Sequence, residues 1–131
     1  MRTRTVTAAH VRAYVKKADE YLAAATSELD NGRSIAATSL AIHAAINAAD
    51  AVTGVRLGTR AAGQDHDRVL DLLREAGKDG AEVERHLARL LPLKTKTEYE
   101  PDDVSKAEAK RAVERAGRCV AVARSLADRA P

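Results

Sequence analysis

The chain has few of the residues that cross-link or interrupt a fold. It contains no Trp or Phe, three Tyr, one Cys, three Pro and seven Gly in 131 residues. The single cysteine, Cys119, excludes an internal disulfide and a multi-cysteine zinc site, and its setting among valines predicts a small core residue rather than a nucleophile. The formal net charge of +3 is too small to indicate a strongly basic nucleic-acid binder.

Alanine and charged residues, by contrast, are plentiful. Hydrophobic residues make up 45% of the chain and charged residues 31%, a balance typical of one folded domain. Because alanine is the strongest helix former and no strand pattern occurs, we expect an all-α fold. The chain starts without the apolar segment of a signal peptide, and no run predicts a membrane span. We therefore expect a cytoplasmic protein without a membrane partner.

Hydrophobic periodicity predicts an antiparallel bundle of four to five helices. Residues 1–6 are expected to form a flexible basic tail, and residues 7–128 a single helical domain. Apolar stripes predict long helices over residues 7–30, 34–53 and 105–127, and shorter ones over residues 65–76 and 81–91. The expected helix caps are Ser34, Asp65 and Ser105. Interruptions are expected at Gly54 and over Gly77 to Gly80, and Pro92 is expected either to stop its helix or to kink the last turn. Gly117 indicates a close helix contact.

The helix predicted over residues 34–53 carries no charge before Asp50, so we expect it to be the buried centre of the bundle. Its polar residues follow spacings of four, four and three, which place them on one face: Ser39, His43, Asn47 and Asp50. A buried carboxylate needs a cation or an open pocket. Four basic residues could supply that cation, namely Arg56, Arg60, Lys94 and Lys96. The stripe is either a structural hydrogen-bond network or part of a functional pocket.

A polar connector over residues 93–103 carries Lys94, Lys96 and Tyr99. Two cations and a phenol could hold a phosphate and stack a base, or Tyr99 could pack over the end of the bundle. The last helix adds a basic face whose spacing suits a phosphate backbone, although the negative charges of Glu108 and Glu114 weaken it. The face consists of Lys106, Lys110, Arg111, Arg115 and Arg118. His86 is expected to be isolated at the surface.

The order of these segments along residues 7–127 resembles that of the HEPN superfamily. The resemblance is greatest to the small stand-alone actinobacterial members of that superfamily. The resemblance is carried by the run from Ser39 to Val52, then Gly58, Gln64-Asp65-His66, the segment from Leu93 to Tyr99, Ser105 and the Ala-rich final helix. It implies a helical bundle, a homodimer, and a place in RNA processing, in toxin–antitoxin or stress systems, or in phage defence.

The resemblance also implies a mechanism for the active members of the superfamily. They are metal-independent ribonucleases whose Arg and His, four to six residues apart near the start of the last helix, form a composite site across a dimer. Here that region has Lys94, Lys96, Glu98 and Tyr99 and no His. Arg and His with five residues between them occur instead as Arg4 with His10 and as Arg60 with His66.

We therefore expect a binding module for RNA or a nucleotide, with its pocket between the central helix and the connector before the last helix. The expected ligand-binding residues are Asn47, Asp50, Arg56, Arg60, Lys94, Lys96 and Tyr99. One alternative is a metal-independent ribonuclease with a substituted active site, for which the candidate catalytic residues are His43, Asp50 and His66. The other alternative is an interaction module that docks a cognate protein partner. No cofactor or metal is expected, because neighbouring residues such as Asp65, His66 and Asp67 do not face one point on a helix.

Overall fold

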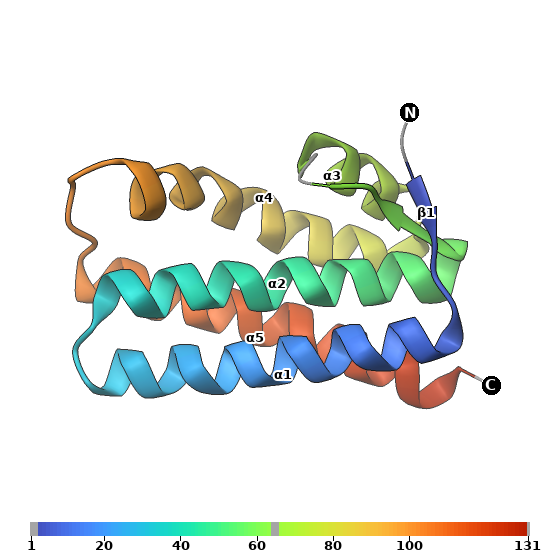
Figure 1. Cartoon of the computed structure of the whole chain (residues 1–131), viewed down its shortest axis with the longest axis horizontal. Helices are drawn as coiled ribbons and strands as arrows, with labels where there is room; N and C mark the ends of the chain where they lie inside the picture. Colours follow the sequence, from blue (N-terminus) through green and yellow to red (C-terminus); the bar gives the residue numbers. More distant parts are fainter. Residues whose placement is uncertain (1–2, 64–65, 131) are drawn as a thin grey trace.

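A computed structural model describes residues 3–63 and 66–130. Across these residues the chain forms five helices and two short strands: β1 (Thr3–Thr5), α1 (Ala8–Asp30), α2 (Ser34–Leu57), β2 (Thr59–Ala61), α3 (His66–Arg74), α4 (Gly77–Tyr99) and α5 (Lys106–Arg129). The long helices run alongside one another, and α3 packs with the strands at one end of the bundle (Figure 1). The predicted all-α bundle of four to five helices is confirmed.

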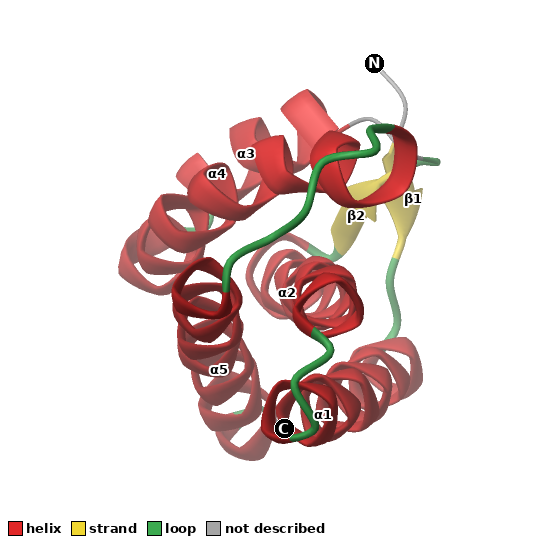
Figure 2. Ribbon diagram, turned by 90° about the vertical axis from the view of Figure 1, so that its left-hand side faces the viewer, coloured by secondary structure: helices red, strands yellow, loops and turns green. Residues whose placement is uncertain are grey.

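Helix α2 is the centre of the molecule, as its lack of charge predicts. Figure 2 shows α2 enclosed by α1, α4 and α5. Its buried positions are mostly alanine, with Ile42 and Val52 as the larger fully buried side chains. Small side chains let the neighbouring helices approach α2 closely, so a chain without Trp or Phe fills its core through short distances rather than large residues.

Helix α2 is also long and apolar enough to cross a membrane, by length and composition alone, which corrects the expectation that no run has this property. More than half of its apolar window, 56%, is buried within the bundle. A core helix enclosed by three others has the same composition as a membrane span.

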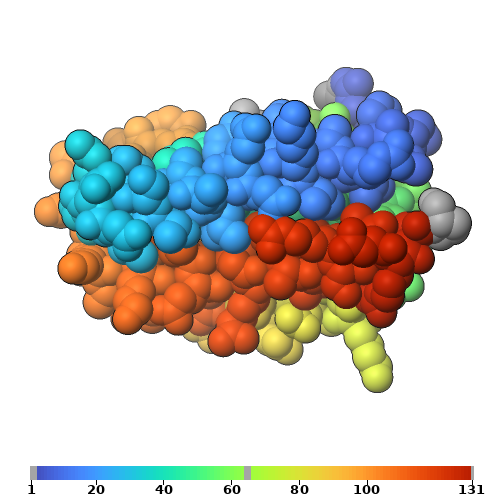
Figure 3. Space-filling model, turned by 90° about the horizontal axis from the view of Figure 1, so that it is seen from below, coloured from blue at the N-terminus to red at the C-terminus, as the bar shows by residue number. Residues whose placement is uncertain are grey.

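The predicted ends of α1 and α5 are confirmed where a side chain caps the helix. Thr7 precedes α1 and its hydroxyl accepts a hydrogen bond from the His10 backbone N–H at 3.2 Å. Ser105 precedes α5 and accepts from the Glu108 N–H at 3.1 Å. The two helices lie side by side (Figure 3), and an ion pair between Asp19 and Arg124 joins them.

The predicted helix end at Gly54 is wrong, and so is the first of the two alternatives at Pro92, a stop, because both residues lie inside helices. The break predicted over Gly77 to Gly80 lies slightly earlier, between Arg74 and Gly77. Helix α2 continues past Gly54 and ends at Gly58, whose φ of 70° is left-handed. Gly54 is small for a packing reason: a Cβ there would lie 2.7 Å from a methyl group of Val6.

Helix α4 likewise runs through Pro92, so that residues 93–99 of the predicted connector are helical.

One prediction of a helix cap and one prediction of a close helix contact are also wrong. Ser34 is the first residue of α2 rather than its cap, and the capping position, Arg33, makes no side-chain capping bond. No heavy atom lies within 4 Å of a Cβ built on Gly117, so this glycine is not a close helix contact. Asp65, the third predicted cap, lies outside the described residues.

The strands β1 and β2 form an antiparallel pair that the sequence does not predict. Arg4 lies directly opposite Arg60 in the register, between the pairs Thr3–Ala61 and Thr5–Thr59. Val6 follows β1 into the core, and its backbone N–H donates to Gly58 at 2.9 Å. Residues 3–6 are therefore held in place and do not form the predicted tail, of which residues 1–2 lie outside the described residues. Strands of three residues are too short to show an alternating pattern.

Candidate functional site

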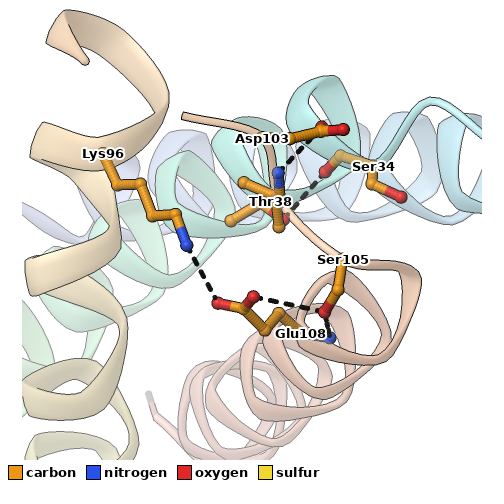
Figure 4. Close-up of polar contacts among 7 residues, drawn as sticks. Ser34, Thr38, Lys96, Asp103, Ser105 and Glu108 are labelled. Atoms are coloured by element: carbon orange, nitrogen blue, oxygen red, sulfur yellow. Dashed lines mark hydrogen bonds and ion pairs between the residues drawn. The ribbon is translucent and has the colours of Figure 1, made fainter. Parts of the chain in front are cut away.

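The pocket predicted between α2 and the connector does not form. Lys94 and Lys96 lie near the end of α4, beside the start of α2, whereas Asp50 lies toward the other end of α2 (Figure 1). Figure 4 shows Lys96 pointing at Glu108 of α5. From Thr38 to Asp50 the helix rises by about 18 Å, too far for either lysine to reach the carboxylate.

The predicted lysines are instead paired with nearby carboxylates. The ammonium nitrogen of Lys94 lies 3.4 Å from Glu98, and that of Lys96 lies 3.4 Å from Glu108. Tyr99 ends α4 with 74% of its surface exposed. The structure therefore does not bring these three predicted ligand-binding residues together with Asp50.

Most residues of the polar stripe on α2 make contacts within the bundle or at its surface. The ring of His43 packs against Tyr21 of α1, with 5.4 Å between the ring centres. Asn47 donates a hydrogen bond to the backbone carbonyl of His43 at 2.8 Å, and Ser39 lines a surface hollow with Ile35 of the same helix. Asp50, the remaining residue of the stripe, is influenced by the charge of a residue outside α2.

Asp50 carries a partly buried carboxyl group, and the basic residue whose charge acts on it is Arg60. Burial raises the pKa of Asp50 from 3.8 to about 7, and the positive charge of Arg60 opposes that rise. Arg60 also lies over the ring of Tyr14, at 5.8 Å from its centre. Arg56, another predicted partner, pairs with Asp79 at 2.6 Å instead.

Arg60 belongs to a cavity of about 430 Å³ that lies beside the strand pair and is lined by Arg4, Thr5, His10, Tyr14 and Arg60. We call it the strand-side pocket. Sequence reasoning identifies Arg60 but misses Arg4 and His10, because their approach depends on β1. The one sequence signal for them is the spacing from Arg4 to His10. His66 begins α3 and is not among the residues that line the pocket.

Tyr14 and His10 both present hydrogen-bond donors at this pocket. Burial, more than any nearby charge, raises the pKa of the Tyr14 hydroxyl, which therefore keeps its hydrogen at neutral pH. The Nδ1 atom of His10 accepts a hydrogen bond from the Thr7 backbone N–H at 3.3 Å. The ring nitrogen that remains, Nε2, then carries the hydrogen of the neutral ring.

A second basic region lies on the other side of α2, where α4 and α5 pack together (Figure 2). We define the α4–α5 arginine surface by Arg85 and Arg89 of α4 and Arg111, Arg115 and Arg118 of α5. Arg89, Arg111 and Arg115 line a common groove of about 210 Å³, together with Leu90, Leu93, Glu108 and Ala112. The sequence predicts the α5 half of this surface and misses the α4 half.

The five arginines of this surface have no carboxylate partner. Within the described ranges, no Asp or Glu oxygen lies within 4.0 Å of any of them. Other arginines of the chain do form ion pairs, as Arg33, Arg56, Arg74 and Arg124 show. The charge of the surface is therefore concentrated, although the net charge of the molecule is small.

His86 lies among these arginines, which corrects the expectation that it is isolated. Its Nδ1 is 3.2 Å from a guanidinium nitrogen of Arg115, and because a guanidinium only donates, Nδ1 is the acceptor. Burial and then the charges of Arg115, Arg85 and Arg118 lower the pKa of His86, against a smaller opposite effect of Glu82. His86 is therefore neutral at pH 7, with its hydrogen on Nε2.

Cys119 is fully buried and burial raises its pKa to about 12, which confirms the predicted core residue. No group of three or more His, Cys, Asp or Glu side chains able to hold a metal ion occurs in the part of the chain that the structure describes.

Comparison with known proteins identifies the family. No curated protein matches the chain. The family model described as the HEPN domain matches residues 11–126, which fall within the predicted domain and include all of α2, α3 and α4. This match is consistent with a function related to RNA or nucleotides. With the helical bundle and the sequence match in agreement, the chain belongs to the HEPN family.

Proposed function

We propose that this protein binds RNA through the α4–α5 arginine surface. The observation that carries the proposal is the set of five arginines, from two adjacent helices, that lack carboxylate partners within the described residues. Keeping like charges close together without counter-charges is unfavourable, and a polyanion removes that cost. The phosphate backbone of RNA is such a polyanion.

The spacing of the arginines suits an extended ligand. Arg111, Arg115 and Arg118 follow spacings of four and three along α5, and Arg85 and Arg89 follow a spacing of four along α4, so each set shares one face of its helix. Guanidinium groups bind phosphate oxygens in pairs. Two such rows along a groove suit successive phosphates of a strand.

The hydrogen bonds of His10 and His86 favour binding over cleavage at the two basic regions. General-base catalysis needs a ring nitrogen with a free lone pair within reach of the RNA hydroxyl group. The Nδ1 atoms of His86 and His10 already accept hydrogen bonds from Arg115 and Thr7, and each Nε2 then carries a hydrogen. Both rings are arranged to donate a hydrogen bond to a ligand.

The test measures binding of the full chain to a fluorescent single-stranded RNA of about 12 nucleotides over a salt series. For single strands, the slope of log affinity against log salt changes by about 0.7 for each phosphate contact. We expect the double variant Arg89→Gln/Arg111→Gln to bind more weakly and to lose about 1.4 from that slope. The matched control is Arg33→Gln, which changes an exposed arginine already paired with Glu28 and should leave the slope unchanged.

Equal affinity and slope for the parent and the folded double variant would contradict the proposal. Circular dichroism establishes that the variants fold. Gel analysis of the same RNA after incubation separates binding from cleavage, and shortened RNA would favour the ribonuclease alternative. The homodimer and the setting in a toxin–antitoxin, stress or phage-defence system remain part of the proposal, supported by the family match.

A further inference from the structure

The strand-side pocket holds two positive charges that the fold forces together. Arg4 and Arg60 are direct partners across the β1–β2 pair, and like charges at such positions destabilise a strand pair. Arg60 donates one hydrogen bond, to the Ala61 carbonyl at 2.9 Å. No carboxylate within the described residues lies at ion-pair distance from either guanidinium. The charge of Asp50 acts on Arg60 from beyond ion-pair distance, so the cross-strand pair has no directly bound carboxylate among the described residues.

The remaining side chains of the pocket add donors of hydrogen bonds. Tyr14 and Thr5 contribute hydroxyl groups, and His10 contributes its Nε2–H. Asp50, the nearby carboxyl group, is not among the residues that line the cavity. A ligand in the cavity therefore meets guanidinium, hydroxyl and imidazole donors.

The number and charge of these donors favour one kind of anion. A phosphate monoester carries about −1.5 to −2 charges at pH 7 and three acceptor oxygens. A phosphodiester within an RNA chain carries one charge and two free oxygens. Two guanidinium groups match the monoester in charge, and a cavity of about 430 Å³ has room for the group that carries it.

We propose that the strand-side pocket binds a phosphate monoester, the terminal phosphate of an oligonucleotide or of a free nucleotide. This inference does not depend on the α4–α5 arginine surface, which lies on the opposite side of α2 (Figure 2). A terminal phosphate reaches the pocket without an RNA strand passing through it, because the group stands at the end of its molecule.

The first experiment uses the unmodified full chain and three calorimetric titrants: adenosine 5′-monophosphate, its methyl ester and inorganic phosphate. We expect the monophosphate to bind at least tenfold more tightly than the methyl ester, which lacks the second charge. Equal binding of the two would overturn the proposal. Inorganic phosphate that binds as tightly as the monophosphate would support it and identify the free phosphate group as the whole ligand.

The second experiment distinguishes an oligonucleotide end from a free nucleotide. Two short RNAs, identical except for a 5′-phosphate or a 5′-hydroxyl, are compared in anisotropy measurements with a 3′ fluorophore. A tenfold preference for the 5′-phosphate supports an oligonucleotide end as the source. A preference confined to the mononucleotide supports a free nucleotide. Absence of any preference for monoesters in both experiments overturns the inference.

Substitutions of the two lining arginines test whether the preference for phosphate monoesters comes from the strand-side pocket. Arg4→Gln and Arg60→Gln should each reduce the monoester preference at least tenfold, and Arg33→Gln, paired with Glu28 elsewhere, should keep it. Arg4 is exposed, so its replacement should leave the fold intact even if that of Arg60 does not. A preference that survives both pocket variants would overturn the assignment. In Arg89→Gln/Arg111→Gln the preference should persist, which separates this test from that of RNA binding.

Discussion

Asp50 is the residue at which burial and charge oppose each other most directly. Its pKa of about 7 in the folded chain stands above the ordinary value of 3.8, so the folded state holds a proton that the unfolded state releases. The stabilisation from this proton is complete below about pH 3.8 and is lost as pH rises through about 7. The carboxyl group thus makes the fold less stable in alkaline solution.

Replacement of Asp50 by Asn removes this titration while keeping the size of the side chain. We expect the parent to lose on the order of 2 kcal/mol more unfolding free energy than Asp50→Asn between pH 5 and pH 8, at about 1.4 kcal/mol per pKa unit. Urea denaturation at several pH values measures the difference. Other titrating groups are shared by both proteins, so parallel pH profiles would contradict the prediction.

Two glycines inside helices allow a matched comparison at the same scale. Alanine is favoured over glycine in a helix by about 1 kcal/mol. A Cβ on Gly80 would lie 2.2 Å from the Leu73 carbonyl oxygen, whereas one on Gly117 meets no heavy atom within 4 Å. We expect Gly117→Ala to raise the unfolding free energy by up to about 1 kcal/mol, and Gly80→Ala to lower it by about 2 kcal/mol. Thermal denaturation that shifts both variants in one direction would refute this difference.

At this scale the sequence predicts one of the five residues that line the strand-side pocket, Arg60. Asp50 is a carboxylate on a predicted helix that carries no other charge, so a nearby cation is expected. Arg60 is one of the basic residues that could supply it. Arg4 and His10 escape it, because their position depends on a strand pair between distant segments. The physical cause of the pocket, the pairing of Arg4 with Arg60, is a tertiary contact that no local pattern encodes.

Among the elements, α4 is unusual because it contains a proline. Pro92 lies inside the helix Gly77–Tyr99, where it removes one backbone hydrogen bond and crowds the preceding turn. Its side chain is exposed, so a change there disturbs little packing. We expect Pro92→Ala to raise the unfolding free energy by about 2 kcal/mol, less than the full helix penalty of proline because the unfolded chain also becomes more flexible. Chemical denaturation measures it, and an unchanged or lower value would contradict the prediction.

The elements also show which local signals determine helix ends. Thr7 and Ser105 mark true starts because their side chains bond to the first turn of the helix. Gly54 and Pro92 do not mark ends, since apolar residues pack against the core on both sides of them. Val52 is buried before Gly54 and Val55 is partly buried after it. Leu90 is buried before Pro92 and Leu93 is partly buried after it. Burial across these positions outweighs the local preference to stop.

The molecule as a whole presents its two basic regions on opposite sides of α2 (Figure 2). Substitutions at separated sites without shared partners usually add to within about 0.5 kcal/mol. We therefore expect the effects of Arg60→Gln and Arg111→Gln on unfolding free energy to add in the double variant. Denaturation of the two single variants and the double variant completes the cycle, and a coupling above about 1 kcal/mol would show that the regions communicate.

The same arrangement explains why the net charge is a poor guide to this protein. The formal charge of +3 averages over the molecule, whereas ion pairs such as those of Arg56 and Arg74 neutralise some faces and leave others basic. Periodicity predicts the basic face of α5 from the sequence. The contribution of Arg85 and Arg89 becomes apparent only when α4 packs beside α5, because helix packing decides which faces meet.

The pairing of β1 with β2 finally has a consequence for the order of events during synthesis. Arg4 is made before Arg60, which follows it by roughly 3 to 11 seconds at about 5 to 20 residues per second. Until then β1 has no partner strand and the first helix has no completed second helix to pack against. The strand-side pocket is thus absent from the early nascent chain, and its ligand can select only a protein whose central helix has already been made.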